Sequence, residues 1–115
     1  MSLANLISRL VSGTSVPAIE HDEFQKAVLE GHCHIVDVRE PHEYAAGRIP
    51  NAVNYPLSQF DPSQLPSDKP VVLVCQAGGR SAKALAQMQA HGRQDVVHYA
   101  PGTGGWKSRG GAIVM

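Results

Sequence analysis

The sequence has no surplus of charge, no long apolar run and very little cysteine. Its 115 residues include ten Lys and Arg and ten Asp and Glu, so the formal net charge is zero. A nucleic-acid-binding domain normally carries a basic surplus, so we expect no nucleic-acid partner. No apolar run approaches the roughly 18 residues of a membrane-spanning helix. We therefore expect no membrane partner and a cytoplasmic protein.

The two cysteines, Cys33 and Cys75, allow one disulfide at most. In a short chain without the features of a signal peptide, we expect both thiols to stay reduced. A disulfide is the alternative, because both residues belong to strands of one predicted sheet. His32 and His34 flank Cys33, but side chains alternate along a strand, so the three cannot converge on one metal ion. We expect no metal site, Cys33 as a small buried group, and the remaining histidines at the surface.

The first 15 residues have apolar side chains at helical spacing, namely Leu3, Leu6, Ile7, Leu10 and Val11. We interpret residues 1–15 as an N-terminal amphipathic extension that packs on the domain or on a partner. A partly disordered leader is the alternative. Residues 16–115 contain no repeat, no linker and no low-complexity tract, which predicts one domain.

Strands and helices are predicted to alternate about every 20 residues. The expected strands are Val16–Ile19, His34–Val38, Ala52–Asn54, Val71–Cys75 and Asp95–Tyr99. The expected helices lie within Ala18–Gly31, Glu40–Gly47 and Ser81–His91, and Pro101–Trp106 (PGTGGW) is expected to form a glycine-rich turn. This order favours an α/β domain with a mainly parallel central sheet and helices on both faces.

Cys75 stands where the apolar strand VVLVC ends, and the segment QAGGRS follows it. In an open parallel sheet, active groups gather beyond the carboxyl ends of the strands. The glycines allow a sharp turn that points successive N–H groups inward, and Ser81 opens a helix whose positive end faces the same place. A thiol in such a nest has a lowered pKa and reacts as a thiolate.

Cysteine phosphatases use a related anion-binding loop, with five residues between their cysteine and arginine. Four residues separate Cys75 from Arg80 here, and Val74 precedes the cysteine where tyrosine phosphatases usually have histidine. The shorter loop makes a tighter ring of donors, which suits one sulfur better than a phosphate. A cysteine phosphatase or an arsenate reductase is therefore the weaker interpretation.

The loop CQAGGRS resembles the active loop of the rhodanese (sulfurtransferase) family, whose pattern is Cys-x-x-Gly-x-Arg-Ser/Thr. Three further stretches match that family in order: IVDVREPHEYAAGRIPNAVNYPL, the helix after the loop, and GTGGW. The resemblance covers the chain from about Val16 to its C-terminus. It implies a rhodanese-like fold for residues 16–115.

The resemblance also implies a sulfurtransferase of the thiosulfate:cyanide type, with Cys75 as the nucleophile that carries sulfur as a persulfide. The persulfide would be held by the loop residues Gln76, Ala77, Gly78, Gly79, Arg80 and Ser81. The implied partners are a small anionic or persulfide donor, and a cyanide, thiol or protein-thiol acceptor. No metal or organic cofactor is implied.

Several other residues match the family's motifs. Asp37 and Arg39 form its Asp-x-Arg element; they are either a structural ion pair, or Arg39 faces the pocket and receives an anionic donor while Asp37 orients the backbone. Arg80 either binds the substrate anion or braces the loop through a carboxylate. We interpret Glu43 and Arg48 as scaffold residues, although the family commonly has histidine at the position of Arg48. Trp106 is expected to be a packing anchor.

The chain departs from the family just after the cysteine. Family members that react efficiently with thiosulfate often have a basic residue at this position. Gln76 and Ala77 are neutral, which favours a persulfide or polysulfide donor over the thiosulfate dianion. Pro101 also replaces the first glycine usually found before the tryptophan. An interaction module or sulfur carrier with this fold is the third alternative, although such modules have often lost the cysteine that this chain retains.

Overall fold

A computed structural model describes residues 17–115 of the protein. The predicted N-terminal extension, residues 1–15, lies outside the described residues. No helix among the described residues has the length and apolar character needed to cross a membrane.

Four strands form one sheet in the order β2-β1-β3-β4: β1 (His34–Asp37), β2 (Val53–Asn54), β3 (Val71–Val74) and β4 (Val96–His98). Each neighbouring pair is parallel. Val36 of β1 lies opposite Leu73 of β3, which in turn lies opposite His98 of β4. Ala18 adds a parallel bridge to His98 beyond β4. The predicted parallel α/β sheet is therefore confirmed.

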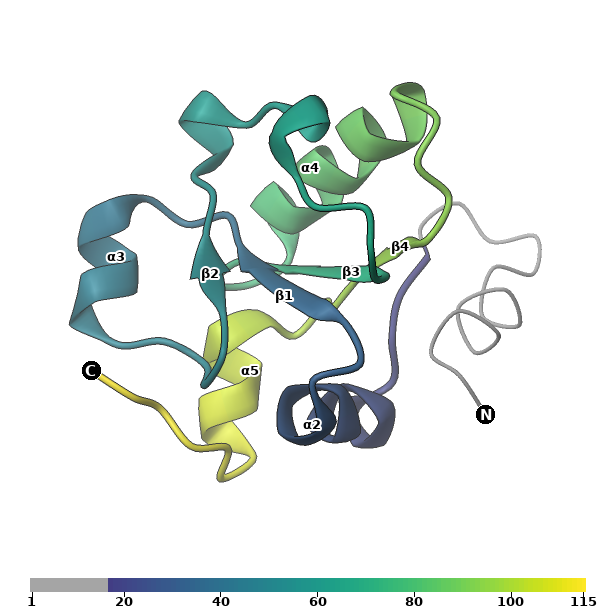
Figure 1. Ribbon diagram of the computed structural model, residues 1–115. Coiled ribbons are helices and arrows are strands. Elements are labelled where there is room, and N and C mark those ends of the chain that lie inside the picture. The colour runs from purple at the N-terminus through teal and green to yellow at the C-terminus, as the bar shows by residue number, and fades with distance from the viewer. Residues whose placement is uncertain (1–16) are drawn as a thin grey trace.

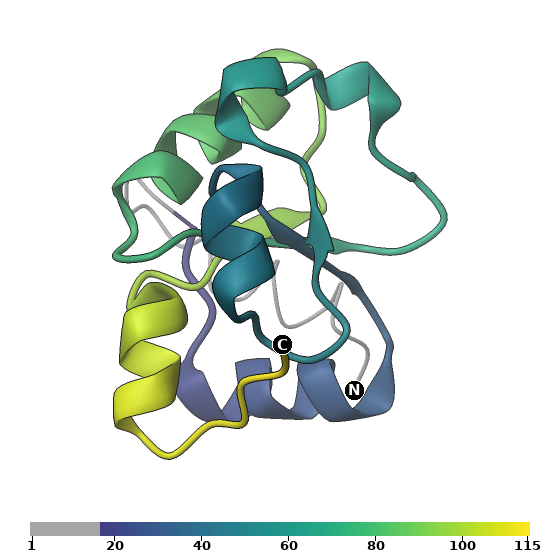
Figure 2. The same ribbon diagram turned by 90° about the vertical axis from the view of Figure 1, so that its left-hand side faces the viewer.

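Helices cover both faces of the sheet, as predicted from the alternation of elements (Figure 1). α2 (His21–Glu30) and α5 (Gly102–Ser108) lie on one face, and α4 (Gly79–Ala90) lies on the other. The 3-10 turns η1 (Leu57–Gln59) and η2 (Pro62–Gln64) share the side of α4. α3 (Pro41–Ala46) lies beside the edge where the strands end, between the two helical layers (Figure 2).

All four residues of β3 are buried. A strand that is covered on both faces needs apolar side chains at every position, which accounts for the continuous apolar sequence VVLV. Val72 and Val74 belong to the cluster that contains Phe24 of α2 and Trp106 of α5. The other two residues of β3 belong to the second cluster, with Leu85 and Met88 of α4. β3 is therefore shared by both apolar layers, and close packing on its two faces fixes the strand from which Cys75 follows.

The prediction for residues 101–106 is wrong, because most of this segment belongs to α5 and not to a turn. Helix propensity is low there, since three of the seven residues of GTGGWKS are glycine. Tertiary contacts compensate: the amides of Thr103 and Gly104 donate to the carbonyls of Cys75 and Gln76 at 2.8 and 3.1 Å. α5 therefore forms because its first turn is hydrogen-bonded to the loop that follows β3.

Candidate active site

The thiol of Cys75 lies at the carboxyl edge of the sheet, directly after the last residue of β3. The amide of Val38, just past β1, donates to the carbonyl of Val74 at 2.8 Å, so the two chain segments leave the sheet together. Cys75 is 1% exposed, whereas Gln76 and Ala77 are at the surface. The thiol therefore lies just beneath an exposed loop, at the place in a parallel sheet where ligands usually bind.

Gly78 makes the turn between Cys75 and α4 possible. Its φ is 100°, and a Cβ atom at this position would lie 2.5 Å from the carbonyl oxygen of Ala100. Residues with a side chain rarely adopt this conformation, and the neighbouring backbone leaves no space for one. Glycine is therefore required here, which matches the invariant position of the sequence pattern.

Replacing Gly78 by alanine is expected to destabilise the protein by about 1–3 kcal/mol, because it adds backbone strain and a collision with the backbone. Gly79→Ala is the matched control, since its Cβ would meet nothing within 4 Å and its φ is not positive. Because Gly79 is the first residue of α4, that control should be neutral or slightly stabilising. Urea denaturation measures both; equal losses would contradict this account of the loop.

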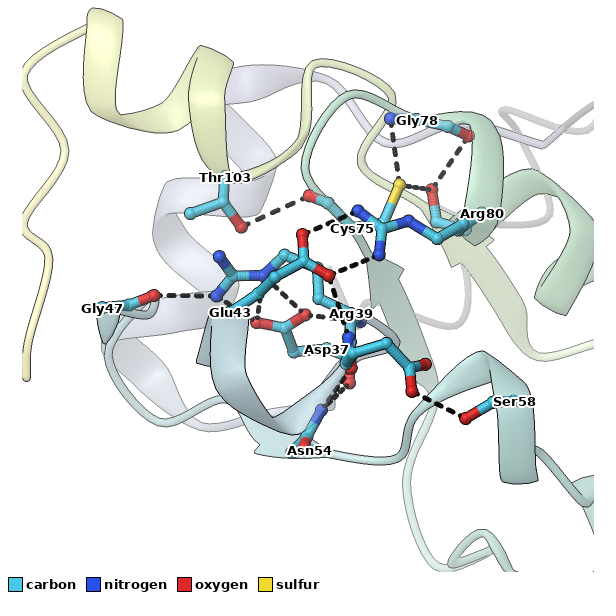
Figure 3. A network of polar contacts seen from close by, with 12 residues as sticks. Asp37, Arg39, Glu43, Gly47, Asn54, Ser58, Cys75, Gly78, Arg80 and Thr103 are labelled. Atoms are coloured by element: carbon cyan, nitrogen blue, oxygen red, sulfur yellow. Dashed lines mark hydrogen bonds and ion pairs between the residues drawn. The ribbon is translucent and has the colours of Figure 1, made fainter. Parts of the chain in front are cut away.

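Hydrogen-bond donors surround the sulfur of Cys75. The amide of Gly78 donates to Sγ at 3.0 Å (Figure 3). The hydroxyl oxygen of Ser81 lies 3.6 Å from Sγ. Burial is the largest single influence on the pKa of Cys75 and raises it. The hydrogen bonds from the Ser81 hydroxyl and from the amides of Ser81, Ala77 and Gly78 together outweigh burial, so the pKa is lowered. The loop therefore favours the thiolate.

Cys33 has the opposite environment. Burial raises the pKa of its thiol to about 11, and Lys69 lowers it by a smaller amount. Both cysteines are free in the structure, which disagrees with the alternative of a disulfide between them. Cys33 belongs to the apolar cluster of α2 and Cys75 to that of α4, on opposite faces of the sheet. Cys33 is therefore the small buried group that was predicted.

The guanidinium of Arg80 is directed at Glu43 of α3 (Figure 3). It makes two hydrogen bonds to the carboxylate of Glu43, at 2.6 and 2.9 Å. The hydrogen bond from Arg80 lowers the pKa of Glu43 to about 2. Glu43 also accepts from the amide of Glu40, which caps α3. This geometry matches the bracing alternative for Arg80, since a two-point pair of this kind fixes orientation as well as charge.

The guanidinium of Arg39 is held by acceptors of the protein itself, which favours the structural interpretation of the Asp-x-Arg element. Arg39 is 4% exposed, and its guanidinium donates to Asp37 at 2.7 and 3.0 Å and to the carbonyl of Gly47 at 2.8 Å (Figure 3). Asp37 also accepts from the backbone amide of Arg39 at 3.0 Å. A buried carboxylate needs such partners, and it draws the arginine inward. The contacts are those of a structural ion pair.

His98 is a functional candidate that the sequence reasoning missed. The expectation that the remaining histidines are at the surface is wrong for this residue, which is 5% exposed in β4. Its Nδ1 lies 2.8 Å from the hydroxyl oxygen of Ser81, and Ser81 is fully buried beside Cys75. The burial of His98 could have been predicted from its place in the apolar strand DVVHY. Every residue of a strand is buried when helices cover both faces of the sheet.

The other predicted positions have scaffold contacts. Trp106 is 4% exposed, packs edge-on against Phe24 and donates to the carbonyl of Ala112 at 2.7 Å, as expected of a packing anchor. Arg48 lies over the ring of Tyr44, with 4.7 Å between its guanidinium carbon and the ring centre. Arg48 also pairs its backbone with Val114. Both residues support the chain around the site.

Comparisons with known proteins agree with this geometry. A sulfurtransferase of Allochromatium vinosum is 37% identical over 70% of the chain and 77% of its own length. A putative sulfur carrier protein of Bacillus subtilis is 30% identical over 85% of the chain and 55% of its own length. The crystal structure of a rhodanese-related protein from Thermoplasma volcanium superposes with a TM-score of 0.75, at 28% identity, over 84% of the chain and 96% of its own.

The chain spans about half the length of several curated relatives that it matches, including 44% of one from Synechocystis. The model of the rhodanese-like domain family matches residues 20–109, which include every loop residue described above. The protein therefore belongs to the rhodanese-like domain family.

Proposed function

We propose that the protein is a sulfurtransferase that carries a sulfane sulfur as a persulfide on Cys75. One observation carries the proposal: a thiol at the end of the central strand is surrounded by the amides of Ala77, Gly78 and Ser81 and by the Ser81 hydroxyl. Each of these donors lowers the pKa of Cys75. They suit a nucleophile that must be negatively charged before and after it accepts sulfur.

The reaction has two displacements. The Cys75 thiolate attacks the outer sulfur of the donor, and the new S–S bond forms as the donor's own bond to that sulfur breaks. The leaving group, sulfite from thiosulfate or a thiolate from a persulfide, departs with the electron pair. An acceptor thiolate or cyanide then attacks the outer sulfur, and the Cys75 thiolate leaves. No oxidant is needed, and the loop amides stabilise the anionic sulfur throughout.

The charge of the site favours a persulfide donor over thiosulfate. The guanidinium of Arg80 is paired with Glu43, and that of Arg39 is buried against Asp37. Each guanidinium is thus already paired with a carboxylate, which offsets its charge, and Gln76 and Ala77 add no charge. Placing an uncompensated dianion beside a buried thiolate is electrostatically costly, while a persulfide brings one charge or none.

Replacing Gln76 by arginine is expected to raise kcat/KM for thiosulfate about tenfold, because one added cation attracts the dianion at the loop surface. Gln76→Met is the control, since it changes the side chain at similar size without adding charge. The rate with an alkyl persulfide should change much less. A steady-state assay measures the ratio of kcat/KM for thiosulfate to kcat/KM for the alkyl persulfide. If this ratio is the same in the arginine variant as in the wild type, the charge argument is contradicted.

A panel of reactions tests the proposed function. Sulfur transfer is measured from thiosulfate and from an alkyl persulfide, to cyanide and to a small thiol, and hydrolysis of an aryl phosphate is measured beside it. We expect transfer from at least one sulfane donor and no phosphate hydrolysis. Phosphate hydrolysis without sulfur transfer would assign the loop to the phosphatase class instead.

A further inference from the structure

His98 is connected to the sulfur of Cys75 through one hydroxyl group. Its Nδ1 lies 2.8 Å from Ser81 Oγ, and Ser81 Oγ lies 3.6 Å from Cys75 Sγ. The three side chains come from β4, α4 and the end of β3, and none is more than 5% exposed. The sulfur-transfer steps above use Cys75 and Ser81 but assign nothing to His98.

The Ser81 hydroxyl has one hydrogen but three polar neighbours. Besides the sulfur and His98, the carbonyl oxygen of Gly78 lies 3.2 Å from Ser81 Oγ and can only accept. If His98 Nδ1 accepts from the hydroxyl, no hydrogen is left for the thiolate. If Nδ1 carries the ring hydrogen and donates, the hydroxyl hydrogen is left for the thiolate, which as an anion attracts it more strongly than the carbonyl does. The tautomer of His98 therefore decides whether Ser81 stabilises the thiolate.

Burial, and no neighbouring charge among the described residues, sets the ionisation of His98. Burial lowers its pKa, so the ring holds one hydrogen near neutral pH. Arg80, the cationic residue of the loop, directs its guanidinium at Glu43 on α3. Cys75, from the end of β3, is the ionisable group that His98 reaches through Ser81.

We propose that His98 is a positioning residue: its Nδ1–H donates to Ser81 Oγ and thereby directs the Ser81 hydroxyl hydrogen toward the Cys75 thiolate. The inference rests on the proposed function, in which that thiolate is the nucleophile. His98 itself touches no donor and accepts no proton in the reaction. Its effect is on the fraction of Cys75 that is ionised.

The test is the pH dependence of Cys75 alkylation by iodoacetamide, followed on the Cys75 peptide by mass spectrometry. Losing a hydrogen bond to a charged sulfur is expected to slow alkylation about tenfold at a pH below the thiol's pKa. His98→Leu and Ser81→Ala should each show this loss. His98→Asn should keep the wild-type profile, because its amide nitrogen replaces Nδ1. His98→Gln should behave like the leucine variant, because its amide nitrogen matches Nε2 instead.

The double variant His98→Leu/Ser81→Ala separates this role from a merely structural one. If His98 acts only through Ser81, alkylation of Cys75 should be no slower in the double variant than in Ser81→Ala. A full additional loss in the double variant, or a wild-type profile in His98→Leu, would overturn the inference. An imidazole ¹⁵N NMR spectrum of the unmodified protein needs no variant: it should show the Nδ1–H tautomer, and an Nε2–H tautomer would overturn the inference. Alkylation needs no sulfur donor, so failure here is distinct from failure of sulfur transfer.

Discussion

Cys75→Ser is expected to lower sulfur transfer at least about 10³-fold, to the background rate, with every donor and acceptor. The hydroxyl of serine does not ionise in the range where a thiol does, so the amides of the loop have no anion to stabilise. The persulfide would have no atom on which to form. The measurement is the rate of thiocyanate or product-persulfide formation per protein molecule, with the same donors for both proteins.

Cys33→Ala is the matched control for this variant. Burial raises the pKa of Cys33 to about 11, and its side chain belongs to the apolar cluster on the other face of the sheet. Its removal should cost some stability and leave the transfer rate within a few-fold of wild type, roughly the scale of an indirect packing effect. Loss of transfer in Cys33→Ala with retention in Cys75→Ser would refute the assignment of the nucleophile.

The second large effect is on stability. Asp37→Asn is expected to lower the free energy of unfolding by about 3–5 kcal/mol, because it leaves the guanidinium of Arg39 buried without its counter-charge. Asp37 is fully buried and accepts hydrogen bonds from the guanidinium and from the backbone amide of Arg39. The variant also puts an amide donor against the donors of Arg39. Urea denaturation measures the loss.

Asp95→Asn provides the comparison, because Asp95 also pairs with an arginine two residues away. That pair, with Arg93, is nearer to solvent, with 38% of the Asp95 side chain exposed. The cost there should be at most about 1 kcal/mol, as for other exposed ion pairs. Equal losses in the two variants, or a loss of activity without a loss of stability in Asp37→Asn, would contradict the structural role of the Asp37–Arg39 pair.

Much of the fold could be predicted from the sequence because its signals are local. β3 was visible as an apolar run, and the predicted helix ranges Ala18–Gly31 and Glu40–Gly47 contain α2 and α3. Gly31 follows the end of α2 in a left-handed conformation, and Pro41 begins α3, as is common for these residue types. α5 was not visible, because GTGGW lacks helix propensity and the segment is held by carbonyls of the Cys75 loop, 28 residues earlier for the Thr103 contact. Long-range hydrogen bonds of this kind leave no local pattern.

The site shows the same difference between features set by local sequence and features set by long-range contacts. The position of Cys75 and its loop followed from the strand end, the glycines and the helix start. The inward orientation of Arg39 did not, because it depends on how deeply Asp37 is buried. His98 was missed because its partner Ser81 is 17 residues away in the chain and meets it only when β4 and α4 pack together.

The most direct test of Cys75 as the sulfur carrier is the intact mass of the protein after incubation with each sulfane donor and removal of excess donor. The proposed mechanism predicts a gain of one sulfur atom, about 32 Da, that is absent in Cys75→Ser, present in Cys33→Ala, and lost when cyanide or an acceptor thiol is added. A protein that turns over donor and acceptor without ever gaining that mass, or that still gains it in Cys75→Ser, would contradict a Cys75 persulfide.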